Sequence, residues 1–401
     1  YLSKNNFSDS EIANFLSYRF LAVILLSYPL GYFITFRRLK PMFIISSFLM
    51  PFIAIALVLS IKLSLSIYLN YLFFIWGVIF VIFQICVLPF IMRYSSDKNQ
   101  TYCISLSFST HSIAMLISGL LIFISSSLLN IDEGDILIFL SILGFGSLYF
   151  SLKINEVKIE NEPNVIKDRK YDWYLILQCI FPTLIIAIGA GLTIPFINLF
   201  FFHNFNLDSS GFALVGGITS LLIAISSLLV PFLKQKYGFK KSIIHTQLFA
   251  VIALVLLSST AYLNEFSFMI YFAIFFYMFR APLMNMAAPL TSELTMSYVG
   301  NKNQEMLSAI VAAIWSGSWF FSSKIFKFLI DINFNYSQIF YITSLLYLIG
   351  IYLYYKLKPG GEIVIDFYPI NGFWTKLSAK YILIESSVIG CFRQYVTAFE
   401  I

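Results

Sequence analysis

Two arginines lie inside long apolar stretches of this sequence, where a charged side chain needs a specific reason. Arg280 lies about thirteen residues into its stretch, which is roughly 20 Å along a helix. An Arg near the centre of a bilayer costs about 2.5 to 3.5 kcal/mol on insertion scales. Arg19 lies about eight residues into another stretch. In a low-dielectric interior such guanidinium groups attract anions strongly.

Both arginines have a structural alternative. Arg280 would instead pair with backbone carbonyls or with the end of another helix. Arg19 lies roughly 12 Å from the end of its stretch, so its side chain can extend to the lipid headgroups.

Uncharged polar side chains add further candidates. His111 is flanked by hydroxyl residues and either handles protons or packs as a hydrogen-bonded core residue. Gln84, Asn198 and Asn285 are amides embedded in apolar sequence, which line a cavity or bridge helices. Interhelical bonds of that type contribute only about 0.6 kcal/mol on average.

Several kinds of chemistry find no support. We place all twenty carboxylates in loops, near the ends of apolar stretches or in the tail, which disfavours a cation exporter. The four Cys are scattered and the chain has three His, so we expect no metal site and no cofactor. No phosphate-binding glycine loop is present, and we do not expect an enzyme.

The composition indicates which elements hold these residues. The chain is 59% hydrophobic and 11% charged, with a mean hydropathy of +0.84. Segments of about 20 apolar residues cross a bilayer as helices, because lipid offers the backbone no other hydrogen-bond partner. We predict eleven spans, at residues 12–36, 41–61, 67–92, 103–126, 136–152, 173–200, 211–233, 242–261, 267–290, 305–329 and 338–355.

A short basic turn between two spans occurs twice, at an offset of 200 residues. This spacing is typical of a transporter built from two repeated halves. The first copy contains Gly31, Arg37, Arg38 and Lys40, and the second contains Lys236, Gly238, Lys240 and Lys241.

Most Lys and Arg residues outside the spans fall in the loops on the side of these two turns. The positive-inside rule therefore places that side, and the C-terminal tail, in the cytoplasm.

The polar stretch at residues 153–172 separates five predicted spans from six. We therefore expect an N-terminal helical bundle at 1–152 that lacks its first helix, a cytoplasmic linker at 153–172 and a C-terminal bundle at 173–356.

The chain resembles the major facilitator superfamily, whose members carry a motif of the form G-x-L-x-D-R-x-G-R-K between their second and third helices. The second basic turn matches it better, because the first has Thr35 where the Asp would lie. Two stretches resemble a bacterial branch of this superfamily, Ile188–Phe201 and Phe279–Pro289. Gly191 permits close helix packing and Pro195 allows a bend, so this segment is either a hinge or ordinary tight packing.

The resemblance implies an all-α membrane protein with two six-helix bundles related by pseudo-two-fold symmetry, of which eleven of twelve helices are present. It implies a secondary transporter that works by alternating access, for which the arginines favour a small organic, anionic or amphiphilic solute. The alternatives are a drug-type exporter of hydrophobic compounds and a non-transporting sensor. We expect a monomer in the bacterial inner membrane that contacts solute and lipid and no nucleic acid.

The tail at residues 357–401 departs from this pattern. Its start, Leu357–Tyr368, resembles a turn and strand of class I methyltransferases, but the glycine-rich loop of that fold is absent. The tail is a cytosolic extension, a remnant of a fused enzyme or the product of a joining error, and we expect no active site in it.

Overall fold

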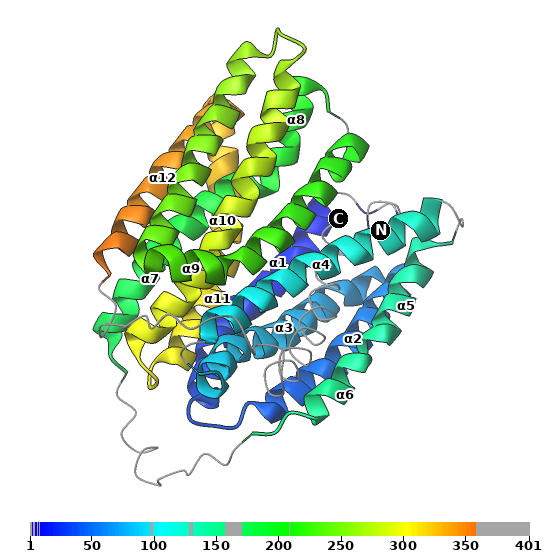
Figure 1. Cartoon of the computed structure of the whole chain (residues 1–401). Coiled ribbons are helices and arrows are strands. Elements are labelled where there is room, and N and C mark those ends of the chain that lie inside the picture. The colour runs from blue at the N-terminus through cyan, green and yellow to red at the C-terminus, as the bar shows by residue number, and fades with distance from the viewer. Residues whose placement is uncertain are drawn as a thin grey trace. The chain divides into compact units, whose positions relative to one another are not determined.

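The computed structural model describes residues 9–96, 99–127, 131–156, 171–207 and 209–357, together with Leu2, Asn5 and Phe7. These residues are mostly helical and contain no β-strand (Figure 1). The tail beyond Leu357, with its predicted strand, lies outside the described residues, as does most of the predicted linker.

The helices follow the order of the predicted spans. Their bounds are α1 Asp9–Ile34, α2 Lys40–Lys62, α3 Ser66–Tyr94, α4 Gln100–Ser127, α5 Glu133–Gly144, α6 Gly146–Leu152, α7 Trp173–Thr193, α8 Ile197–Phe205, α9 Ser209–Thr260, α10 Met269–Val299, α11 Gln304–Asp331 and α12 Tyr336–Lys356. Two short 3₁₀ turns, Ile194–Phe196 and Ala261–Leu263, follow α7 and α9.

Each predicted span overlaps one or more helices, and those at 136–152 and 173–200 each overlap two. Within the described residues, ten helical segments are long and apolar enough to cross a membrane. The segment at 214–263 holds two predicted spans, which meet in a kink at Gly238, where φ is 76° and ψ is 171°. Only glycine adopts this backbone conformation readily, which explains a glycine at the second basic turn.

One predicted helix end was wrong. The span expected at 267–290 continues as α10 to Val299, so Glu293 lies on a helix and not in a loop. Polar residues after Leu290 suggested a loop, but their side chains bond inside the helix: Thr291 Oγ1 donates to Ala287 O at 3.0 Å and Thr295 Oγ1 to Thr291 O at 2.8 Å.

The chain divides into two compact units. Of the described residues, unit 1 contains those up to Asp172 together with Asn301–Ala313, and unit 2 contains Trp173–Gly300 and residues 314–357. The first turns of α11 thus belong to unit 1, whereas the predicted bundle at 173–356 includes all of that helix. Ala309 packs directly against Gly31 of α1, which accounts for this assignment.

The two halves of the chain repeat the same helix order. The later helix of each pair begins 200 to 204 residues after the earlier one, as the starts of α1 and α9, α3 and α10, α4 and α11, and α5 and α12 illustrate. The offset between the basic turns is therefore a property of the whole helical framework.

Each unit has its own apolar core. In unit 1, α1 and α2 pack against α3 around the fully buried Phe73 and Trp76. In unit 2, α9 packs against α10, and α12 against α7 and α9, around Phe200, Phe340 and Tyr347. These cores fix the helices that carry the polar side chains described below.

Gly77→Ala is expected to lower the free energy of unfolding by about 1–3 kcal/mol, as overpacking of a filled core does. A Cβ at Gly77 would lie 2.4 Å from the backbone oxygen of Arg19 and 2.8 Å from Ala22 Cβ. Thermal unfolding of the purified protein in detergent measures the change. Gly146→Ala is the matched control, because a Cβ there meets no atom within 4 Å. Equal stability of the two variants would contradict the close crossing of α1 and α3.

Candidate functional site

Arg280 is a buried guanidinium in the core of unit 2. It lies on α10 with 4% of its surface exposed. Its Nη2 donates to Tyr347 Oη at 3.3 Å, and its Nε makes no hydrogen bond to a described residue. In the part of the chain that the structure describes, no carboxylate forms an ion pair with Arg280. Its positive charge therefore has a neutral hydroxyl as its hydrogen-bond partner.

Two tyrosines interact with this guanidinium. Tyr347 on α12 is 1% exposed, and its ring lies so close to α7 that a Cβ at Gly189 would be 2.9 Å from Tyr347 Cε1. Tyr277, one turn before Arg280, interacts with it electrostatically and packs its ring on Phe201 and Phe212. The site therefore combines one buried cation with aromatic rings and hydroxyl groups.

The other predicted site residues of unit 2 are bonded locally. Asn285 lies on α10, five residues after Arg280, and donates to Ala281 O at 2.8 Å. Residues five apart point in different directions around a helix. Asn198 is exposed, and its Oδ1 accepts from Leu199 N at 2.8 Å. Neither amide contacts Arg280 through a hydrogen bond.

The helix is interrupted around Pro195, where the sequence left a hinge and ordinary tight packing as alternatives. Helix α7 ends at Thr193, the 3₁₀ turn Ile194–Phe196 contains Pro195, and α8 continues from Ile197. Gly191 lies just before this break in close contact with α11, because a Cβ there would be 2.7 Å from Ser322 Cβ. Close packing and a bend therefore occur together in this segment.

Arg19 is enclosed by aromatic rings in unit 1. It is 5% exposed, with Cζ 5.2 Å from the ring centroids of Phe20 and Phe80 and 5.6 Å from that of Trp76. Cation–π contacts contribute about 0.5 to 2 kcal/mol each. This burial does not fit a side chain that extends to lipid headgroups.

His111 and Gln84 lie elsewhere in unit 1. His111 is half-buried on α4, and the neighbouring hydroxyls of Thr110 and Ser112 bond to backbone carbonyls of that helix. Gln84 is half-buried on α3, where its Oε1 has no hydrogen-bond partner among the described residues. A role in proton handling or solute binding stays a prediction for both.

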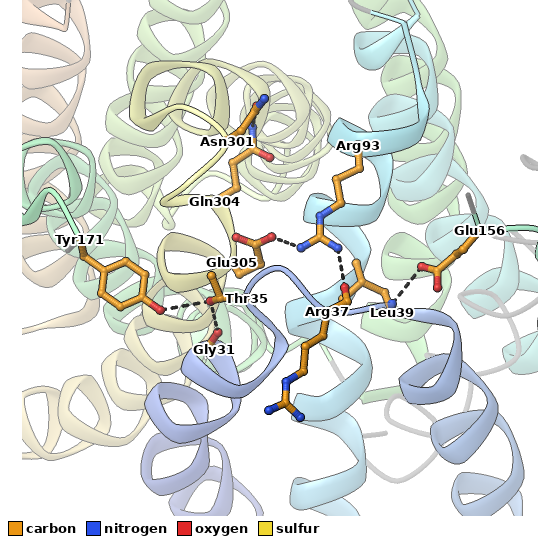
Figure 2. Close-up of polar contacts among 10 residues, drawn as sticks. All are labelled: Gly31, Thr35, Arg37, Leu39, Arg93, Glu156, Tyr171, Asn301, Gln304 and Glu305. Atoms are coloured by element: carbon orange, nitrogen blue, oxygen red, sulfur yellow. Dashed lines mark hydrogen bonds and ion pairs between the residues drawn. The ribbon is translucent and has the colours of Figure 1, made fainter. Parts of the chain in front are cut away.

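The first basic turn is the centre of a polar network in unit 1 (Figure 2). Thr35 Oγ1 donates to Gly31 O at 2.7 Å and lies 3.1 Å from Tyr171 Oη. The Glu156 carboxylate accepts from Leu39 N at 2.9 Å and from Lys40 N at 3.0 Å, which satisfies amides at the N-terminus of α2.

Arg93 connects this turn to α11. Its Nη1 donates to Arg37 O at 2.8 Å, and its Nη2 forms an ion pair with Glu305 in the first turn of α11. Arg37 itself is exposed, with its guanidinium 4.1 Å from the Phe33 ring centroid, and Arg38 is exposed as well. The cation that bonds this network is thus the half-buried Arg93, which the motif does not contain.

The second basic turn is held by an ion pair of unit 2. Lys234 Nζ lies 2.6 Å from Glu293 Oε1 and 3.9 Å from the Phe239 ring centroid. Lys240 Nζ donates to Tyr355 O at 3.2 Å, whereas Lys236 and Lys241 are exposed.

Sequence reasoning missed Arg93, Glu293, Glu305 and Tyr347 as members of these sites. The three charged residues lie near helix ends, where charge is ordinary, and Tyr347 is one of 25 Tyr. The repeat contained a usable signal. In the first half, Arg93 near the end of α3 bonds the first basic turn. In the second half, Glu293 on the equivalent helix, α10, pairs with Lys234 beside the second basic turn.

Solved structures with a similar fold are known. No family model and no curated protein matches the sequence. Among solved structures, a bacterial homologue of the iron transporter ferroportin in the outward-facing state has a TM-score of 0.64 and 15% identity, over 89% of this chain and 92% of that one.

Two further structures agree. The major facilitator superfamily transporter FucP in the outward conformation has a TM-score of 0.67 and 11% identity, over 86% of this chain and 90% of that one. The proton:xylose symporter XylE has a TM-score of 0.68 and 14% identity, over 88% of both chains. With its two repeated helical units and its membrane-length helices, the chain has the fold of the major facilitator superfamily.

Proposed function

We propose that this multi-pass membrane protein is a secondary transporter of a small organic anion, whose negative group binds Arg280. The observation that carries the proposal is an Arg280 guanidinium with 4% exposure whose hydrogen-bond partner, among the described residues, is a neutral Tyr hydroxyl. A buried charge is costly unless it is paired. An anionic solute would supply the negative charge that Arg280 lacks and would accept a hydrogen bond from its Nε–H group.

The aromatic surroundings of Arg280 favour an amphiphilic anion over a fully hydrophilic one. Tyr347 and Tyr277 interact with the guanidinium, and the Tyr277 ring packs on Phe201 and Phe212. Arg19, in its own aromatic enclosure, is a weaker candidate, because three rings already stabilise its charge.

The proposal also assigns gating to the two basic turns. Gly31 and the turn that contains Arg37, Arg38 and Lys40 contact the first turns of α11 directly or through Arg93. In the second turn, Gly238 provides the kink beside Lys236, Lys240 and Lys241. We further propose that both turns face the cytoplasm of a bacterial cell, on the basis of the Lys and Arg distribution.

A thermal-shift screen of the purified full chain tests the proposal. The probes are aliphatic and aromatic carboxylates, sulfonates and organic phosphates, each compared with its neutral amide or alcohol. Stabilisation by an anion and not by its neutral analogue is expected, followed by exchange of that radiolabelled anion in proteoliposomes. Stabilisation by neutral or cationic amphiphiles alone would overturn the anion site and favour a drug-type exporter. Binding without exchange would indicate a sensor.

A further inference from the structure

Glu305 is a deeply buried carboxylate in unit 1 with one unused oxygen. It lies in the first turn of α11 and is 1% exposed. Oε1 pairs with Arg93 Nη2, whereas Oε2 accepts no hydrogen bond from any described residue (Figure 2). Leaving a buried acceptor unbonded is unfavourable, and more so when the acceptor is charged. Protonation of Oε2 would therefore remove the free-energy cost of a buried, charged oxygen that accepts no hydrogen bond.

The comparable ion pair of unit 2 lacks this feature. Glu293 is 2% exposed and pairs with Lys234 at 2.6 Å. No oxygen of Glu293 is both buried and without a partner, in contrast to Oε2 of Glu305. Burial and an ion pair are thus common to both glutamates, and the unused oxygen distinguishes Glu305.

The state of Glu305 decides what holds the first turn of α11 to the basic turn. When the carboxylate is ionised, Arg93 bonds both Glu305 and the backbone oxygen of Arg37, and so bridges α11 and the turn. When Oε2 carries a proton, the side chain is neutral and the Coulomb attraction to Arg93 is lost. The apolar contact between Gly31 and Ala309 then remains.

Other charged and titratable groups surround this pair. Arg93, Arg37 and Lys40 contribute positive charge, Glu156 contributes negative charge, and Cys86 and Tyr171 are neutral when protonated. Cys86 on α3 is fully buried and interacts electrostatically with Arg93, Glu156 and Glu305. Arg93 is the ion-pair partner of Glu305, so its charge opposes protonation while burial favours it.

We propose that Glu305 is the binding site of the coupling proton. A proton from water adds to Oε2, no other bond forms or breaks, and the neutral side chain releases Arg93 and with it the first turn of α11. This inference rests on the proposed secondary-transporter function, because it names the ion that such a transporter would couple to its solute. It does not depend on the identity of that solute.

Infrared difference spectroscopy during a pH titration of the purified full chain tests proton binding without any solute. As the pH falls from about 9 to about 4, wild type should gain a carboxyl C=O band from a buried acid, and this band should be absent from Glu305→Gln. Glu293→Gln is the matched control and should retain the band. Glu305→Asp keeps a carboxyl group and should show a titrating band, which distinguishes loss of the acid from misfolding. An unchanged band in Glu305→Gln would overturn the proposal.

A second measurement tests release of the pair. In a background in which Cys103, Cys179 and Cys391 are replaced by Ser, Cys86 reports whether this region opens. Glu305→Gln mimics the protonated state, so maleimide should label Cys86 about tenfold faster than in the parent at the same pH, a factor that corresponds to about 1.4 kcal/mol. Labelling at the parent rate would contradict release.

The two proposals fail separately. If the Glu305-dependent infrared band is observed but no anion stabilises the protein, the proton site is supported and the anion site is overturned. Anion stabilisation that depends on Arg280, together with no Glu305 band, would leave the anion site intact and overturn the proton site.

Discussion

Arg280→Gln is expected to weaken the binding of the stabilising anion by about 10- to 150-fold. Hydrogen bonds to a charged group contribute about 1.5–3 kcal/mol, and each 1.4 kcal/mol is a factor of ten in affinity. Glutamine keeps a hydrogen-bond donor but removes the buried charge. Thermal shift at graded anion concentrations gives the affinity, and exchange in proteoliposomes gives the effect on transport.

Lys324→Gln is the control for this change, because it removes the same charge from an exposed side chain. Lys324 is exposed, and its Nζ lies 4.6 Å from the Phe320 ring centroid. The affinity of the Lys324→Gln variant for the anion should match that of wild type. Tyr347→Phe removes the hydroxyl that accepts from Arg280 Nη2 and should lower affinity less than Arg280→Gln. Wild-type affinity in Arg280→Gln would exclude this arginine from the binding site.

Arg93→Leu is expected to destabilise the protein by about 3–5 kcal/mol near neutral pH, because it leaves the buried Glu305 carboxylate without its partner. The double variant Arg93→Leu/Glu305→Leu should be considerably more stable than the single variant, since apolar side chains then fill the site of a buried pair. Unfolding in a denaturing detergent, analysed as a double-mutant cycle, isolates the pair energy.

The ion pair of Lys62 with Asp132 provides the reference for an exposed pair. Lys62 Nζ lies 2.9 Å from Asp132 Oδ2, and the Asp132 side chain is 56% exposed. The hydrogen bond from Lys62 holds the pKa of Asp132 below its usual range, but solvent screens such a pair. Lys62→Leu should therefore cost under about 1 kcal/mol. If Arg93→Leu cost no more than Lys62→Leu, the buried bridge to α11 would not stabilise this structure.

Local sequence predicted the helices well because lipid imposes a simple rule. A spanning segment must bond its own backbone, so length and hydropathy suffice to find it. The exception at α10 has the same origin, because Thr291, Thr295 and Glu293 look like loop residues until their helical partners are known. The break at Pro195 was predictable for a local reason too, namely the missing N–H group of proline.

Residue roles in the candidate site were less predictable. The apolar context identified Arg280 and Arg19, but it did not distinguish a guanidinium with a hydroxyl partner from one enclosed by Phe20, Trp76 and Phe80. That distinction depends on which helices lie side by side. The basic turns were found by their repeat, whereas Arg93, which bonds the first turn, lies more than 50 residues away from it.

The sequence by itself determined the membrane-protein class, the helical spans and the 200-residue repeat, because these follow from composition and spacing along the chain. Only the tertiary structure decided which charges are paired. It brought Glu305 from the start of α11 to Arg93 at the end of α3, 212 positions apart, and left one carboxylate oxygen unused. Charge pairing depends on distances of a few ångströms between helices, and no local pattern encodes them.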